Sequence, residues 1–302
     1  MILLLHANFL AFGNPEDYSL KSFSRCFAEA FTLTPVNIFV LITGFFGTHF
    51  SIKKASNLIF QVIFCVVPIS LILATCGIID YDYHFFVFHK YWFINAYIAL
   101  LVITPVLNAA VKAFSQKEFK TCLISFYIII IIVNYTGLRG IPINEGYSTL
   151  WFIFLYLLGR YIKKYQPTFT TKQLIAIILI CCLCNSIIIF TLHYCDYINP
   201  FIVIQSVGTL LLFTKCEIKS NVINTVAAST TMVYLINLHP ALWGMIQKAL
   251  WSFYLNYNTF IFLLYTVLFC VAIFVFAIVY DKLRLLVWKK IELLLSKIPI
   301  FE

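Results

Sequence analysis

The sequence TFIFLLYTVLFCVAIFVFAIVY occupies residues 259–280 and decides the fold of this chain. It runs for 22 residues without an Asp, Glu, Lys or Arg. A helix that crosses the hydrocarbon core of a membrane needs about 20 mostly apolar residues in succession. The stretch therefore predicts a transmembrane helix, and similar runs elsewhere in the chain predict others.

Nine more apolar runs precede this stretch. They lie near residues 1–12, 34–50, 58–79, 92–111, 119–135, 148–162, 173–193, 200–214 and 222–243. The longer runs are continuous, whereas the strands of a membrane barrel alternate in polarity and last about ten residues. The first run is too short to span, and no cleavage site of a signal peptide follows it, so we expect part of the first helix to precede Met1. We predict an all-α fold, a polytopic membrane helical bundle of about ten transmembrane helices.

The composition supports a lipid environment. Of 302 residues, 62% are hydrophobic and only 11% are charged, against roughly 25% charged in an average soluble domain. This excludes an ordinary soluble protein and makes the lipid bilayer a partner. The formal net charge of +9 does not indicate nucleic acid binding, because the basic residues are scattered between the apolar runs rather than gathered on one face.

The basic residues predict an orientation in the membrane. Sixteen of the 21 Lys and Arg residues fall in one alternating set of loops and in the C-terminal tail, and Lys and Arg accumulate in short cytoplasmic loops. We therefore expect both termini in the cytoplasm and outer loops near 13–33, 80–91, 136–147, 194–199 and 244–258. Residues 1–281 form the membrane domain, and the basic amphipathic tail at 282–302 is expected to lie on the cytoplasmic leaflet or, alternatively, to be a frayed soluble end.

Few side chains inside the spans are able to transfer a proton. No Asp, Glu, Lys or Arg lies near the middle of a predicted span, which argues against a carboxylate-based ion pump. His6 stands in an otherwise apolar run, and a neutral imidazole there is able to accept the proton of a hydroxyl. The alternative is that His6 is a hydrogen-bonded structural residue. His239 precedes Pro240, which suggests a break in the ninth span.

Metal and cofactor motifs are missing from the sequence. The ten cysteines include no pair of Cys-x-x-Cys motifs of the kind that binds zinc. Phosphate-binding glycine loops and His-Glu metalloprotease motifs are also absent. We therefore expect no metal site and no tightly bound cofactor.

Five stretches together resemble the integral-membrane acyltransferase 3 family, in particular its bacterial members that O-acetylate surface polysaccharides. They are LLLHANF (3–9), PVNIFVLITGFFG (35–47), YWFINAYIALLVITPVLN (91–108), YSTLWFIFLYLLGRYI (147–162) and VAASTTMVYLINLHP (226–240). The third, with its Trp-Phe, Tyr and Pro-x-Leu-Asn elements, is the most specific. The resemblance covers nearly the whole chain and implies a multi-pass protein of the bacterial cytoplasmic (inner) membrane.

The resemblance also implies a reaction. Acetyl-CoA is expected to donate from the cytoplasm to a glycan or lipid-linked saccharide acceptor near the outer side, with His6 as general base. Lys53 and Lys54 correspond to family positions that contact the phosphates of CoA, although here they are Lys rather than the usual Arg, and their alternative role is to set membrane orientation.

Further residues of the matched stretches are expected to shape the site: Trp92, Tyr97, Asn108, Asn237 and His239. Asn237 stands where relatives often carry a His. An Asn is able to donate a hydrogen bond to the thioester oxygen but does not shuttle a proton.

Two other functions stay open at the level of sequence. A multi-pass transporter or flippase of a lipid-linked sugar would account for the span count and for the amide side chains in the spans. A catalytically inactive relative is the second alternative, because only five residues precede His6.

Overall fold

The computed structural model describes residues 1–7, 17–80, 91–138 and 140–298. Throughout these ranges the regular secondary structure is helical, and no strand occurs among them. The all-α prediction is therefore confirmed. The chain divides into two compact units, one built mainly from residues 15–50 and 92–217, the other from residues 2–14, 51–91 and 218–302.

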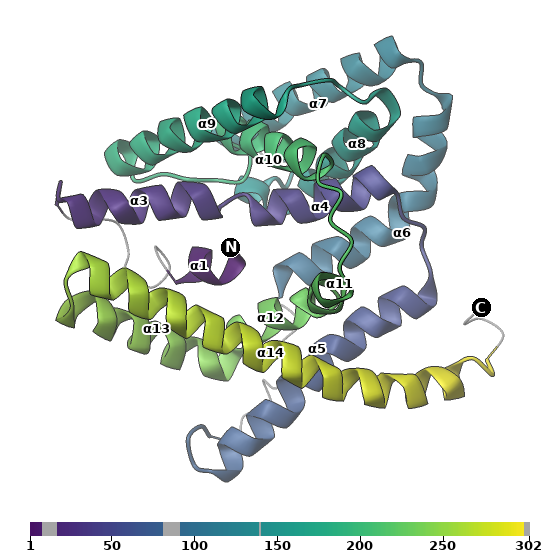
Figure 1. The fold of residues 1–302 in the computed structure, drawn as a ribbon. Helices are drawn as coiled ribbons and strands as arrows, with labels where there is room; N and C mark the ends of the chain where they lie inside the picture. The colour runs from purple at the N-terminus through teal and green to yellow at the C-terminus, as the bar shows by residue number, and fades with distance from the viewer. Residues whose placement is uncertain (8–16, 81–90, 139, 299–302) are drawn as a thin grey trace. The chain divides into compact units, whose positions relative to one another are not determined.

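The first unit is a helical bundle (Figure 1). Its helices are α3 (Leu20–Thr32), α4 (Pro35–Phe46), α6 (Trp92–Ala113), α7 (Gln116–Thr136), α8 (Thr149–Tyr165), α9 (Thr171–Leu192) and α10 (Pro200–Phe213), with a single 3₁₀ turn at Asn144–Gly146. Several start at well-formed caps. Ser115 and Thr170, for example, each form a capping box at the start of α7 and α9, where backbone N–H groups would otherwise lack partners.

The closest packing in this unit joins α4 to α8. A Cβ atom added to Gly44 would lie 2.2 Å from the backbone oxygen of Tyr156, and one added to Gly159 would lie 2.4 Å from the backbone oxygen of Leu41. Small residues at facing positions let the backbones of two membrane helices approach closely. Next to this contact, the buried side chain of Asn37 accepts a hydrogen bond from the indole of Trp151 and donates one to the carbonyl of Tyr197.

The second unit contains α1 (Ile2–His6), α5 (Ile52–Thr75), α11 (Asn221–Ala227), α12 (Thr230–Asn237), α13 (Pro240–Asn256) and α14 (Thr259–Leu295). Helix α14 is the longest of the described helices, and α13 packs along it (Figure 1). The segment expected as one span at 222–243 is divided into α11, α12 and the start of α13. Helix α12 ends before Pro240, because proline lacks the N–H that would continue the helix.

Prolines also interrupt two long helices, and in each case a hydroxyl replaces the missing N–H. Pro68 in α5 leaves the carbonyl of Phe64 without its helical donor, and the hydroxyl of Tyr280 on α14 donates to that carbonyl at 2.8 Å. Pro105 in α6 likewise leaves the carbonyl of Leu101 without its helical donor, and the hydroxyl of Thr104 donates to that carbonyl at 2.7 Å. Nearby Ser, Thr and Tyr hydroxyls are the usual substitutes within a bilayer.

Six helical segments are long and apolar enough to cross a membrane: α3 together with α4, and α5, α6, α7, α9 and α14. Helix α10 is apolar but shorter. The segments expected as loops at 13–33 and 244–258 contain α3 and α13. Helix α3 carries its polar and apolar residues on different faces, so it lacks the continuous apolar run that marks a span. The second half of the run at 1–12 and most of the loop predicted at 80–91 lie outside the described residues.

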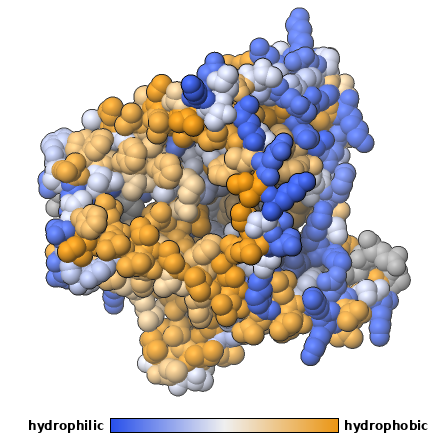
Figure 2. Space-filling view, viewed as in Figure 1, coloured by the Kyte–Doolittle hydropathy of each residue, from blue (hydrophilic) through white to orange (hydrophobic). Residues whose placement is uncertain are grey.

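The outward surfaces of the helices are apolar. Figure 2 shows hydrophobic side chains over the viewed faces of α9 and α10 in the first unit, and of α13 and α14 in the second. Exposed residues on α9 include Leu179, Ile180 and Ile187, and those on α14 include Leu268 and Val271. A large apolar surface of this kind is unfavourable in water and normal in contact with lipid tails.

The Gly159→Ala substitution is expected to destabilise the protein. The added methyl would meet the backbone of α4, including the nitrogen of Phe45 at 2.9 Å, so the two helices must separate. Overpacking of this kind costs about 1–3 kcal/mol. The midpoint of thermal unfolding of the detergent-purified protein measures the loss. Gly244→Ala in α13 is the matched control, because no atom lies within 4 Å of its added Cβ. Equal midpoints for the two variants would contradict the close α4–α8 contact.

Candidate active site

His6 is the last residue of α1 and is buried, with 7% of its surface exposed. Leu3 and Leu5 are buried and anchor the short helix, and α1 packs against α12 and α14 within the second unit. The imidazole is thus held in an apolar setting, where its hydrogen-bond partners decide what it is able to do.

Asn237 is the main partner of the His6 side chain. It is the last residue of α12, it is buried, and its side-chain amide nitrogen is hydrogen-bonded to Nδ1 of His6. Two residues 231 positions apart in the chain therefore form one polar pair. Both belonged to the set of site residues expected from the sequence, and the structure brings them together.

Helix α13 adds two further contacts that the sequence analysis missed. The side-chain nitrogen of Gln247 donates a hydrogen bond of 3.3 Å to the backbone carbonyl of His6. The indole of Trp243 packs edge-on against the imidazole, with ring centroids 5.8 Å apart. Residues 243 and 247 are one helical turn apart and so lie on one face of the helix. In the sequence, the signal for these two contacts was the four-residue spacing of Trp243 and Gln247 shortly after the pair His239-Pro240.

The amide oxygen of Gln247 is also notable. Its nitrogen faces the His6 carbonyl, which only accepts, so the orientation of this amide is fixed. The oxygen Oε1 is buried and has no hydrogen-bond partner within the described part of the chain. A buried acceptor of this kind calls for a donor, such as the hydroxyl of a ligand or a water molecule.

The pair of His6 and Asn237 accommodates two proton arrangements. When the Asn237 nitrogen donates to Nδ1, a neutral imidazole carries its proton on Nε2. When the amide is turned by 180°, its oxygen accepts a proton held on Nδ1, and Nε2 is left with a free lone pair. The nitrogen and oxygen of an amide occupy nearly equivalent positions, so both arrangements fit the same contact. Only the second makes Nε2 a base.

His239 has a different environment from His6. It is fully buried and caps the N-terminus of α13, where its Nδ1 accepts a 3.1 Å hydrogen bond from the backbone N–H of Ala241. Its Nε2 lies 3.3 Å from the carbonyl oxygen of Val66 in α5. A carbonyl only accepts, so Nε2 carries the proton and both ring nitrogens are occupied. His239 therefore connects α13 to α5 and has no free lone pair.

Lys53 and Lys54 lie in the first turn of α5. Lys53 is half-exposed and forms an ion pair with Glu292 near the end of α14. The positive end of the helix dipole and two ammonium groups coincide here, which favours an anion.

One residue of the predicted tail differs from expectation. Arg284 was expected to face the leaflet with the other basic residues, but only 2% of its side chain is exposed. Its guanidinium pairs with Asp281 at 2.5 Å and donates to the side-chain oxygen of Asn57 at 2.9 Å. The signal in the sequence was the i,i+3 spacing of Asp281 and Arg284. The residues after 281 continue α14 through Leu295.

The three expected site residues on α6 belong to the first unit. Trp92 packs against Tyr147, with ring centroids 4.5 Å apart, and Tyr97 shares a 3.1 Å hydrogen bond with Thr43. Asn108 donates to the carbonyl of Thr48 at 2.8 Å and accepts from the hydroxyl of Tyr156 at 2.7 Å. Within their own unit, these side chains connect α6 to α4, α8 and the segments that flank them.

The described part of the chain is helical, and several of its helices are apolar and long enough to cross a membrane. These features place the protein in the class of multi-pass membrane proteins, here with a buried histidine in a polar cluster. The family model described as an acyltransferase domain matches residues 1–281. The chain belongs to this acyltransferase 3 family and is therefore a membrane acyltransferase. No curated protein and no solved structure gave a match.

His239→Ala is expected to lower the stability of the protein. It removes the cap of α13 and the contact to Val66, and loss of an N-cap alone costs about 1 kcal/mol. His239→Asn should recover part of the loss, because Asn is a preferred N-cap residue. Thermal unfolding midpoints of the wild type and both variants in one detergent test this. An unchanged midpoint in His239→Ala would refute the structural role.

Proposed function

We propose that this acyltransferase moves an acetyl group from cytoplasmic acetyl-CoA to a hydroxyl of a cell-surface or exported glycan, with His6 as the general base. The observation that carries the proposal is the buried His6 imidazole bonded through Nδ1 to Asn237. In the proposal, this contact fixes the ring and leaves Nε2 for the reacting hydroxyl.

The reaction needs one proton acceptor and no covalent enzyme intermediate. Nε2 of His6 removes the proton of the sugar hydroxyl as the hydroxyl oxygen attacks the thioester carbonyl. The new C–O bond forms, the C–S bond breaks, and the imidazolium returns its proton to the departing CoA thiolate. General base catalysis of this kind contributes typically about 10² to 10⁴ in rate.

Asn237 is the positioning residue in this scheme. Its amide oxygen accepts the proton on Nδ1, which leaves the lone pair on Nε2 and stabilises the imidazolium that forms. In hydrolases that use a His-Asn or His-Asp pair, an acceptor bonded to the ring nitrogen that is not the base orients the catalytic histidine in the same way. In this arrangement the oxygen of Asn237 is engaged by His6, and its NH2 group keeps the expected role of a donor to the thioester oxygen.

The start of α5 supplies the site proposed for the phosphates of CoA. Lys53 and Lys54 offer two positive charges there, and Glu292 holds Lys53 until a phosphate replaces it. Val66, which contacts His239 beside the His6 cluster, lies 13 residues further along the same helix. That is about 20 Å at 1.5 Å per residue, a separation suited to the long, extended pantetheine arm.

The same proposal includes the membrane arrangement. About ten spans, with both termini in the cytoplasm of a bacterium, would place the start of α5 at the cytoplasmic face, where acetyl-CoA is found. A glycan or lipid-linked saccharide would then approach from the outer side. Gln247 Oε1, the buried acceptor beside His6, is suited to a hydrogen bond from the acceptor sugar. Trp92, Tyr97 and Asn108 of the first unit stay proposed site residues on the strength of the family resemblance alone.

His6→Ala is expected to reduce transfer of labelled acetyl from acetyl-CoA to endogenous glycan by at least about 10²-fold. The assay uses membranes with matched amounts of the protein. His193→Asn is the control, because His193 is an exposed histidine in a left-handed conformation that Asn also adopts. Full activity in His6→Ala would disprove the proposed base, and movement of a lipid-linked sugar without acetyl-CoA would indicate a transporter instead.

Two substitutions of Asn237 separate its possible roles. Asn237→Asp keeps an oxygen that accepts the Nδ1 proton, whereas Asn237→Leu has a similar size and no acceptor. We expect kcat to fall strongly in the Leu variant and less in the Asp variant, with little change in KM for acetyl-CoA. An equal loss in both variants would show that Asn237 acts as a donor. Protein amounts in the membrane are measured in parallel.

A further inference from the structure

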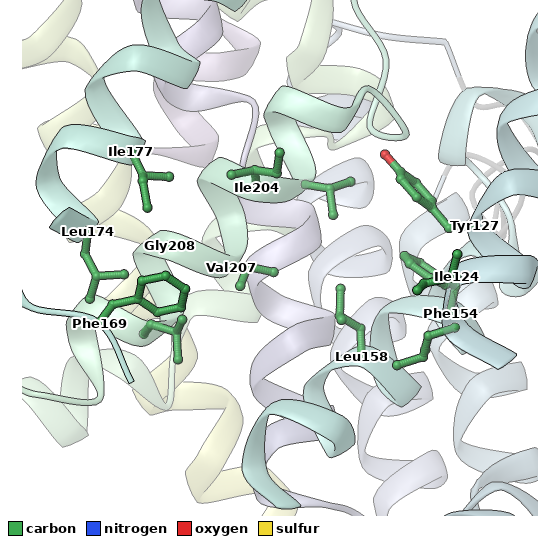
Figure 3. Close-up of a pocket in the computed structure, with 13 residues that line it drawn as sticks. Ile124, Tyr127, Phe154, Leu158, Phe169, Leu174, Ile177, Ile204, Val207 and Gly208 are labelled. Atoms are coloured by element: carbon green, nitrogen blue, oxygen red, sulfur yellow. The ribbon is translucent and has the colours of Figure 1, made fainter. Parts of the chain in front are cut away.

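An apolar groove lies within the first unit, away from the cluster around His6. It has a volume of about 320 Å³ and is lined by α7, α8, α9, α10 and the segment before α9. Figure 3 shows Phe169, Leu174 and Ile177 at one end of the groove and Ile124 and Tyr127 at the other. Apart from the Tyr127 hydroxyl, which donates to the carbonyl of Ile198, the side chains of its lining are hydrocarbon.

The groove continues into a second pocket of different chemistry. This pocket of about 350 Å³ shares Phe169, Leu174 and Leu211 with the groove. The remainder of its lining includes Lys163, Gln166, Thr168, Thr214 and Lys215. We call it the basic pocket. The shared residues place it at the Phe169 end of the groove.

The structure of the chain builds the basic pocket from three helix ends. Helix α8 ends at Tyr165 and is followed by Gln166, whose backbone is left-handed; α10 ends at Phe213 and is followed by Thr214. The segment before α9 supplies Thr168 and Phe169. The ammonium of Lys163 lies 4.9 Å from the centroid of the Phe45 ring, which holds it against the pocket. The lining contains two lysines and no Asp or Glu, so its charge is positive.

We infer that the groove and the basic pocket together bind one anionic phospholipid, with its phosphate between Lys163 and Lys215 and an acyl chain along the groove. A site that changes from hydrocarbon to basic over a short distance matches an amphiphile with a negative headgroup. The two lysines belong to loops that the charge distribution assigns to the cytoplasmic side. Anionic lipids are concentrated in that leaflet, and basic pockets between membrane helices bind their headgroups.

This inference is independent of the reaction proposed above. It requires no acetyl-CoA and no residue of the cluster around His6. A bound lipid of this kind would fill the space between α7, α8 and α10 that side chains leave open.

The test measures lipid retained by the full-length protein in native mass spectrometry. The purified protein receives either phosphatidylglycerol or phosphatidylcholine with identical acyl chains. We expect one phosphatidylglycerol to be retained where phosphatidylcholine is not. The double variant Lys163→Gln/Lys215→Gln should weaken this binding about 30-fold. Loss of one lysine near an anionic headgroup is expected to weaken binding about five- to six-fold, and the two factors multiply. Lys163→Arg/Lys215→Arg should retain it.

Two further variants separate this site from general charge effects. Lys117→Gln/Lys120→Gln removes two exposed lysines from the start of α7 and should leave retention unchanged. Ile204→Trp narrows the groove and should weaken retention without changing any charge. Thermal unfolding in detergent verifies that each variant is folded.

Four outcomes would overturn the inference. Equal retention of the two lipids would show that the headgroup is not recognised. An equal loss in the Lys117/Lys120 variant would show a nonspecific charge effect. Displacement of phosphatidylglycerol by CoA, or equally tight binding of glycerol phosphate without acyl chains, would assign the basic pocket to a soluble phosphate ligand.

Discussion

The structure depends on one constraint: a polar group within an apolar bundle must find its partner inside the protein, because lipid offers none. The two prolines in long helices illustrate it. Each removes one backbone donor, and Tyr280 and Thr104 supply hydroxyls to the carbonyls left over. Arg284 and Asp281 obey the same rule as a buried pair, since either charge alone would be costly in this environment.

The constraint also explains why the polar groups around His6 are bonded to one another. Asn237 bonds to the ring, Gln247 to the backbone carbonyl, and Trp243 covers the imidazole from the side. His239 has both nitrogens occupied by backbone groups, so two histidines that look alike in the sequence have different environments. The His239 ring contacts only backbone groups, whereas the His6 ring is bonded to the side chain of Asn237.

Much of the fold was predictable from hydropathy. Continuous apolar runs indicated the helices α5, α6, α7, α9 and α14, because burial in lipid favours uninterrupted apolar sequence. Helices α3 and α13 were missed, since their polar residues break up the runs. The division of 222–243 was indicated only at its end, by the His-Pro pair. The close approach of α4 and α8 depends on Gly44 and Gly159, and single glycines carry no signal of what they face.

The sequence by itself determined the class of the protein, its helical nature and the family to which it belongs, because these depend on composition, on long apolar runs and on local motifs. It also singled out His6 and Asn237 as separate candidates. Only the tertiary structure decided that these two form a pair, that His239 is engaged, that Arg284 is buried and that Lys163 and Lys215 share a pocket. Such contacts join residues far apart in the chain, and only the packing of the helices brings their side chains together.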